Sequence, residues 1–244
     1  MLLLFVFVKI SFSNQSQETT IPQIAFKAKN LTPDTLQILS KPPVRLLSFA
    51  NESMPLGNER IDNTMKKVLR ANSFHKLQTH KLHHKAHKWF SIIEPVLEKY
   101  GIPEDFKYIP LVESGLTTNL YSPRGAAGLW QFMPQTGRDF GLKVNGEIDE
   151  RFNIKLSTVA AAKYFKSLYK IFGNWTLVAA AYNGGEGRIK KQMRTQKQAN
   201  YFKLKLNRET AKYVYSIISM KEIIEHPEKH GYILRNPRLL AYQR

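Results

Sequence analysis

Residues 101–141, GIPEDFKYIPLVESGLTTNLYSPRGAAGLWQFMPQTGRDFG, decide the fold expected for this chain. Pro103 suits the first position of a helix, and the two acidic residues after it suit the positive end of the helix dipole. Gly115 is a typical helix stop. The stretch therefore predicts a helix over residues 103–115, followed by a loop rich in small residues.

Glu113 lies on the apolar side of this predicted helix. At helical spacing it shares a face with Phe106, Ile109 and Pro110. A carboxylic acid among apolar neighbours loses hydration, which raises its pKa and favours the neutral form needed to protonate a leaving group. The alternative is a carboxylate at a helix end that points into solvent.

The loop after the helix has the composition of a ligand site. Residues 122–128, SPRGAAG, combine turn formers with small side chains that permit close approach of a ligand. Residues 129–134, LWQFMP, place the amide of Gln131 among large apolar groups. A sugar site often has this make-up, although these apolar side chains could also belong to the core.

Several motifs in this order resemble the catalytic domain of soluble lytic transglycosylases. The matching residues are Glu113-Ser114, the run Ser122-x-x-Gly125-Ala126-x-Gly128-Leu129-x-Gln131, Ala181-Tyr182-Asn183-Gly184-Gly185 and Glu209-Thr210-x-x-Tyr213. Trp130 within the Gly-Leu-x-Gln motif resembles the membrane-bound lytic murein transglycosylase D branch. The resemblance extends over about residues 58–225.

This resemblance implies a mainly α, lysozyme-like helical domain with a helical N-terminal extension. It implies cleavage of the β-1,4 bond between N-acetylmuramic acid and N-acetylglucosamine in peptidoglycan, without water and without a cofactor or metal. The product would be a 1,6-anhydro-muramyl end. Glu113 would be the catalytic residue. The implied substrate-binding residues are Ser122, Gln131, Met133, Tyr182, Asn183 and Tyr213.

The number of carboxylates distinguishes this chemistry from ordinary glycoside hydrolysis, which uses two. The implied mechanism needs Glu113 alone, first as acid and then as base. The candidates for a second carboxylate are Asp139, Glu147, Asp149, Glu150 and Glu186. Two alternatives stay open: a hydrolytic muramidase of the goose-type lysozyme kind, and a cell-wall-binding protein without activity.

Charge indicates the class of partner. The 244 residues carry a net charge of +18, with 43% hydrophobic and 23% charged residues, as in a globular protein that binds polyanions. Nucleic acid, an anionic membrane surface contacted peripherally and the cell wall are the candidates. Residues 188–208 hold eight Lys or Arg and no Asp or Glu, which indicates a solvated basic face or attraction of anionic stem peptides.

The N-terminal residues favour the cell wall over nucleic acid. Residues 1–13 resemble a secretory signal or a short anchor, because the apolar run 2–8 is shorter than the about 20 residues of a membrane span. We therefore expect export to the periplasm or cell envelope of a bacterium. The absence of cysteine excludes disulfides and thiol catalysis. Nothing in the sequence specifies an oligomeric state.

We expect the segments after the signal to differ in how regular their structure is. The predicted organisation is a polar arm over residues 14–57, a helical extension over 58–100, the catalytic domain over 101–225 and an irregular tail over 226–244. Helices are expected at 76–100, 153–172, 175–181 and 208–225, with a turn at 182–185.

Histidines cluster between residues 75 and 87. His80, His83, His84 and His87 could meet on one helix face and bind zinc or copper. Lysines interleave with them, so the favoured interpretation is a solvated basic face without metal.

Overall fold

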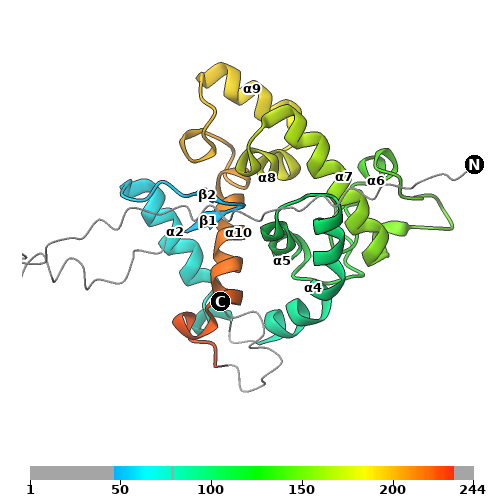
Figure 1. Ribbon diagram of the computed structural model, residues 1–244, viewed down its shortest axis with the longest axis horizontal. Coiled ribbons are helices and arrows are strands. Elements are labelled where there is room, and N and C mark those ends of the chain that lie inside the picture. Colours follow the sequence, from blue (N-terminus) through cyan, green and yellow to red (C-terminus); the bar gives the residue numbers. More distant parts are fainter. Residues whose placement is uncertain (1–46, 78–79, 234–244) are drawn as a thin grey trace, which may run out of the picture. The chain divides into compact units, whose positions relative to one another are not determined.

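Helices dominate residues 47–77 and 80–233, the part of the chain that this computed structural model describes (Figure 1). The prediction of a mainly α fold is confirmed. The α-helices are α2 (Glu59–Asn72), α3 (Phe74–Leu77), α4 (Lys81–Lys99), α5 (Ile109–Ser114), α6 (Pro134–Asp139), α7 (Ile154–Phe172), α8 (Trp175–Gly184), α9 (Glu186–Gln196) and α10 (Thr210–Glu225). Short 3-10 helices are η1 (Glu104–Tyr108), η2 (Glu150–Phe152), η3 (Tyr201–Lys203) and η4 (Pro227–His230).

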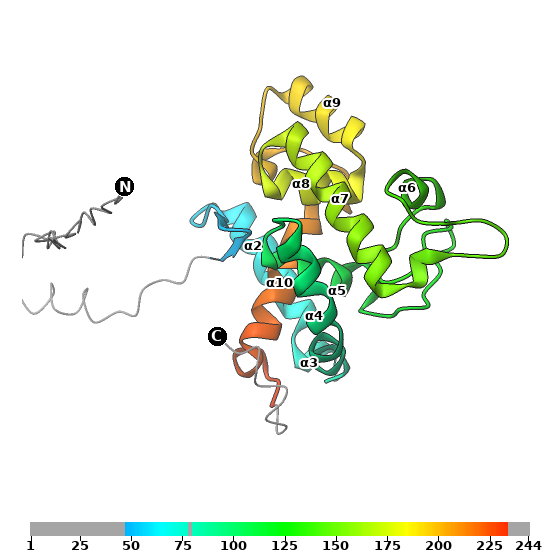
Figure 2. The same cartoon turned by 45° about the vertical axis from the view of Figure 1, so that its right-hand side comes forward.

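The core forms where α7, α8 and α10 pack together with α2 and α4 (Figure 2). Helix α10 contacts α2, α5 and α8, so it lies at the centre of this arrangement. The alanines at 179–181 are fully buried, and their small side chains allow α8 to approach its neighbours closely. The short helix α5 packs against α10.

Side-chain caps fix where several helices begin. Asn58, Asn153 and Asn174 each accept a hydrogen bond from a backbone N–H in the first turn of α2, α7 and α8. Gly173 ends α7 in the left-handed conformation, which costs glycine little. The helix predicted over residues 153–172 is therefore present with nearly the expected ends.

Other predicted boundaries differ from the structure. The helix expected over 76–100 is the separate α3 and α4, and the helix expected over 103–115 begins as 3-10 helix η1 before α5. Helix α8 continues to Gly184, so residues 182 and 183 lie in its last turn instead of in a turn after it. Helix α10 is assigned from Thr210, two residues later than expected, but Asn207 caps this end as predicted, because its side chain accepts a hydrogen bond from the Thr210 N–H and its carbonyl accepts one from the Ala211 N–H.

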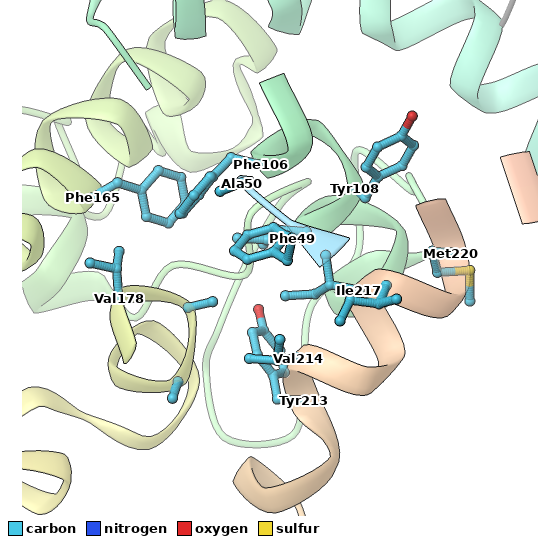
Figure 3. Close-up of a cluster of buried hydrophobic side chains, with 14 of the residues drawn as sticks. Phe49, Ala50, Phe106, Tyr108, Phe165, Val178, Tyr213, Val214, Ile217 and Met220 are labelled. Atoms are coloured by element: carbon cyan, nitrogen blue, oxygen red, sulfur yellow. The ribbon is translucent and has the colours of Figure 1, made fainter. Parts of the chain in front are cut away.

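The end of the predicted polar arm is well packed. Strands β1 (Ser48–Phe49) and β2 (Glu52–Ser53) form a hairpin whose two loop residues have positive φ. Phe49 is buried against Phe106, with ring centroids 4.9 Å apart (Figure 3). Glu52 accepts hydrogen bonds from two N–H groups that open α8, at 2.5 and 2.9 Å. Residues 47–57 are thus part of the folded unit.

The interpretation of the histidine cluster as a solvated face is wrong for His83. Its side chain is buried, its ring centroid lies 4.7 Å from that of Tyr232, and Nε2 donates to the Ile223 carbonyl at 3.2 Å. Burial lowers its pKa to about 4, so the ring is neutral. The expected irregular tail accordingly starts with η4 and the buried Tyr232.

Predictions for residues 1–13 and for most of the arm and the tail lie outside the described residues. Among residues 47–77 and 80–233, no helix is both long and apolar enough to cross a membrane. Within the same ranges, no group of three or more His, Asp or Glu residues is placed to hold a metal ion.

Candidate active site

Glu113 lies in the last turn of α5, where the helix is forced to stop. Gly115 follows in the left-handed conformation, and its N–H donates to the Pro110 carbonyl. The hydroxyl of Ser114 donates to the Leu129 carbonyl at 2.8 Å, and this hydrogen bond ties the end of α5 to the loop at 129–132. The acid is therefore fixed at the point where a helix end meets the predicted ligand loop.

The carboxyl group of Glu113 is held in a partly buried position. The hydroxyl of Tyr213, from α10, donates a hydrogen bond to its Oε1. Burial raises the pKa of Glu113 to about 7, the Tyr213 hydrogen bond acts in the opposite direction, and the nearby negative charge of Glu209 raises it further. At neutral pH the group can therefore both give and take a proton.

The small-residue loop folds into a tight, self-bonded turn. Ser122 accepts a hydrogen bond from the Ala126 N–H through its hydroxyl at 2.9 Å, and its backbone N–H donates to the Ala126 carbonyl. Gly128 has a φ of +76°, and a Cβ atom there would lie 2.0 Å from the Arg151 carbonyl oxygen. Only glycine permits this close approach of two backbones.

Gln131 and Trp130 anchor the second half of the loop. Gln131 adopts a φ of +50°, unusual for a residue with a side chain, and its Nε2 donates to the Leu120 and Gly128 carbonyls. Trp130 is fully buried and donates through Nε1 to Thr158 at 3.0 Å. The loop thus holds Gln131 at the surface of the groove against its conformational preference.

Arg151 holds this loop in place, a role that sequence reasoning missed. Its guanidinium donates to the carbonyls of Gly125 and Phe132 at 2.7 and 2.9 Å and forms an ion pair with Asp149 at 2.6 Å. Arg151 is 1% exposed, so these partners replace its hydration. Burial of Arg151 follows from its contacts with residues 19 and 26 positions away, which no local pattern in the sequence signals.

Helix α8 supplies a phenol and an amide from its last turn. The Tyr182 hydroxyl donates to the Trp130 carbonyl at 2.6 Å, which joins α8 to the loop. Asn183 donates to Glu209 at 3.0 Å and accepts from the Thr210 hydroxyl at 2.8 Å, which joins α8 to the start of α10. The extension of α8 to Gly184 therefore sets the positions of both side chains.

These elements enclose two adjoining cavities that share Glu113, Asn183 and Glu209, so they form one groove with the acid at the junction. The first arm has a volume of about 290 Å³ and the second about 560 Å³. The first arm is also lined by Ser122, Gln131, Met133 and Tyr182, and the second by Tyr213. All seven residues predicted for the site therefore reach this groove.

The five candidates for a second carboxylate are not among the residues that line either arm. Asp149 pairs with Arg151, Glu186 pairs with Lys190, and Glu150 accepts from the Lys143 N–H. The acid that does accompany Glu113 in the groove is Glu209. Glu209 belongs to the motif at 209–213. Because it is far from Glu113 in the sequence, we did not expect it to be a second carboxylate in the site.

Comparison with known proteins agrees with this geometry. Residues 91–205 match the model of the "Transglycosylase SLT domain" family. Over these residues the chain is similar to that family. This SLT domain match includes Glu113 and the groove residues up to Asn183, and Glu209 and Tyr213 follow it in the sequence.

A curated relative extends the likeness beyond the SLT domain. The membrane-bound lytic murein transglycosylase D of Escherichia coli (strain K12) is 32% identical over 194 residues, which cover 76% of this chain and 42% of the relative. The chain thus spans less than half the length of that relative.

Solved structures with detectable likeness also come from lytic transglycosylases. An inactive mutant of lytic transglycosylase Slt from Pseudomonas aeruginosa aligns with a TM-score of 0.45 and 20% identity, covering 74% of this chain and 29% of that one. The 70 kDa soluble lytic transglycosylase of Escherichia coli aligns with a TM-score of 0.42 and 21% identity, covering 74% and 28%.

Proposed function

We propose that this protein is a peptidoglycan lytic transglycosylase. It cleaves the β-1,4 bond between N-acetylmuramic acid and N-acetylglucosamine without water and leaves a 1,6-anhydro-muramyl end. The observation that carries the proposal is the position of Glu113, an acid with a pKa of about 7, where the two arms of the groove meet. The SLT domain match and the named activity of the curated relative support it.

Glu113 acts twice in the proposed reaction. Its protonated carboxyl gives a proton to the bridging oxygen as the bond from C1 to that oxygen breaks. The acetamido group of the substrate stabilises the positive charge that develops at C1. The Glu113 carboxylate then takes the proton of the C6 hydroxyl, whose oxygen bonds to C1 and closes the anhydro ring. Because the nucleophile belongs to the substrate, its effective concentration is high.

The groove residues suit the two protonation states of Glu113. The hydrogen bond from Tyr213 favours the carboxylate that remains after the first proton transfer. Burial holds the pKa of the Tyr213 and Tyr182 hydroxyls well above 10, so both phenols stay neutral donors. Ser122, Gln131 and Met133 line the first arm, and we assign them to holding the sugar.

Hydrolysis is the second candidate, because Glu209 supplies another carboxylate in the same groove. A hydrolytic muramidase needs that carboxylate to orient or activate a water. The transglycosylase does not, since the C6 hydroxyl replaces the water. We favour the transglycosylase because Glu209 is exposed and already accepts a hydrogen bond from Asn183.

Digestion of purified sacculi, followed by mass spectrometry of the released muropeptides, tests the proposal. The wild type should release anhydro-muramyl products, and Glu113→Gln should release none while still binding sacculi. Products that are heavier by one water would identify a hydrolase. Binding of sacculi by the wild type without any cleavage would identify a wall-binding protein.

We infer that the protein works in the cell envelope, at the peptidoglycan. The net charge of +18 supports attraction to the anionic wall and allows peripheral contact with an anionic membrane surface. We likewise propose segment boundaries at residues 13, 100 and 225. Fractionation of cells that produce the full chain would locate it.

A further inference from the structure

We propose that Arg208 and Lys212 bind a carboxylate of the stem peptide that N-acetylmuramic acid carries, so that strands with peptides are cleaved in preference to bare glycan. The inference rests on the proposed function, because it assigns a specificity to the same groove. Both side chains line the second arm, next to Glu113. Neither was predicted to belong to the site.

The two arms of the groove differ in chemistry. The first arm has hydroxyls, amides, aromatic rings and a thioether, the kind of mixed surface that suits a sugar, and it has one cation, Arg124, whose charge Glu209 offsets. The second arm has few aromatic groups and contains two cations, Arg208 and Lys212. A neutral glycan has no charge that would compensate two cations, whereas the free carboxylates of a stem peptide do.

The local fold keeps Arg208 and Lys212 together on the same wall of the second arm. They are four residues apart, Arg208 just before α10 and Lys212 in its first turn, and the Ala211 N–H donates to the Asn207 carbonyl, so the turn between them is helical. Their neighbour Glu209 lines the same arm. While Glu113 is protonated, two cations there face a single carboxylate, and the second arm attracts anions.

Both cations are available to a ligand. Arg208 and Lys212 are exposed, and neither forms an ion pair with any residue in the ranges 47–77 and 80–233. Other lysines of the same part of the chain are paired, such as Lys107 with Glu94 and Lys221 with Asp105. Arg208 and Lys212 are therefore free to pair with an anionic ligand in the second arm.

The covalent structure of the substrate brings the ligand to this arm. The stem peptide is attached to the lactyl group of N-acetylmuramic acid, the sugar whose bond Glu113 is proposed to cleave. The point of attachment is therefore on the same sugar ring as C1, the carbon whose bond breaks. A sugar that occupies the junction can extend its peptide into the second arm.

The experiment compares two substrates prepared from the same glycan strands: one with stem peptides and one freed of them by an amidase that cuts at the lactyl group. Wild type is expected to have a higher kcat/KM on strands with peptides, by about two- to thirtyfold for two exposed charge contacts. Arg208→Gln/Lys212→Gln should reduce this ratio towards one.

A matched control removes two positive charges elsewhere. Lys166 and Lys170 are exposed on α7 and line neither arm of the groove. Lys166→Gln/Lys170→Gln should keep the wild-type ratio. Circular dichroism of both double variants checks that each is folded.

A test on the substrate side needs no variant. Amidation of the peptide carboxylates should remove the preference of the wild type, and added salt should weaken it, because exposed charge pairs are screened. Equal kcat/KM of the wild type on both strands would overturn the inference, and so would an unchanged ratio in Arg208→Gln/Lys212→Gln. Failure of the wild type to cleave either strand would instead refute the proposed function.

Discussion

The hydroxyl of Tyr213 donates a hydrogen bond to Oε1 of Glu113, across 100 residues of chain. The bond joins the first turn of α10 to the last turn of α5. It favours the charged carboxylate, whereas burial and the charge of Glu209 favour the neutral acid. The proton affinity of Glu113 therefore depends on three contributions that the packing of α10 against α5 brings together.

Removal of this donor should raise the pKa of Glu113. In Tyr213→Phe the carboxylate loses a hydrogen bond, and the alkaline limb of the pH profile of kcat/KM should move upwards by about one pH unit. The maximal rate should fall, since the variant no longer stabilises the carboxylate that acts as base. A limb that moves to lower pH would contradict this assignment. Tyr215→Phe, a buried tyrosine on the same helix outside the groove, is the control.

Glu209→Gln separates the two reaction types. The variant removes a negative charge beside Glu113, so the pKa of Glu113 should fall and the alkaline limb should move to lower pH. The Gln side chain can still accept the hydrogen bond from Asn183. We expect less than about a tenfold loss of kcat, with anhydro products unchanged. A loss of about 10²-fold or more would mark Glu209 as a general acid or base.

Glu113→Gln should stabilise the protein at alkaline pH. The pKa of Glu113 is about 7 in the folded state and 4.5 when unperturbed, so the folded state binds more protons between these values. The stability from this group is complete below about pH 4.5 and is lost as the pH rises through about 7. Gln cannot ionise, and its advantage in the free energy of unfolding should grow to at most about 3 kcal/mol at pH 8.

Urea denaturation of both proteins at pH 4, 6 and 8 measures this difference. A constant difference across the three pH values would show that the carboxyl group is hydrated as in the unfolded chain.

Two glycines of the loop should respond differently to alanine. Gly128→Ala places a Cβ atom 2.0 Å from the Arg151 carbonyl oxygen, and the free energy of unfolding should fall by more than about 3 kcal/mol. Gly125 also has positive φ, but a Cβ atom there meets open space. Gly125→Ala should therefore cost only about 1–2 kcal/mol. Equal costs, measured by denaturation, would show that the backbone approach at Gly128 is not tight.

Local signals in the sequence predicted several elements well. Asn153 and Gly173 delimit α7 as expected, since capping and glycine stops depend on residues within a few positions of each other. The end of α8 was misplaced, because the Asn183 side chain gains partners at the start of α10. The burial of His83 was missed for a related reason: Ile223 and Tyr232, which cover it, lie 140 and 149 residues away in sequence.

The sequence by itself determined the mainly helical class and the apolar face on which Glu113 lies, because those signals are carried by residue types at short spacing. The resemblance to a known family supplied the other motif residues, which the structure places along the groove. Only the tertiary structure decided that Glu209 stands beside Glu113, that Arg151 holds the loop, and that Arg208 and Lys212 line the second arm. Each of these facts depends on α10 or η2 packing against distant segments. The spacing of residues along the chain does not encode such proximity, because burial of the shared core sets it.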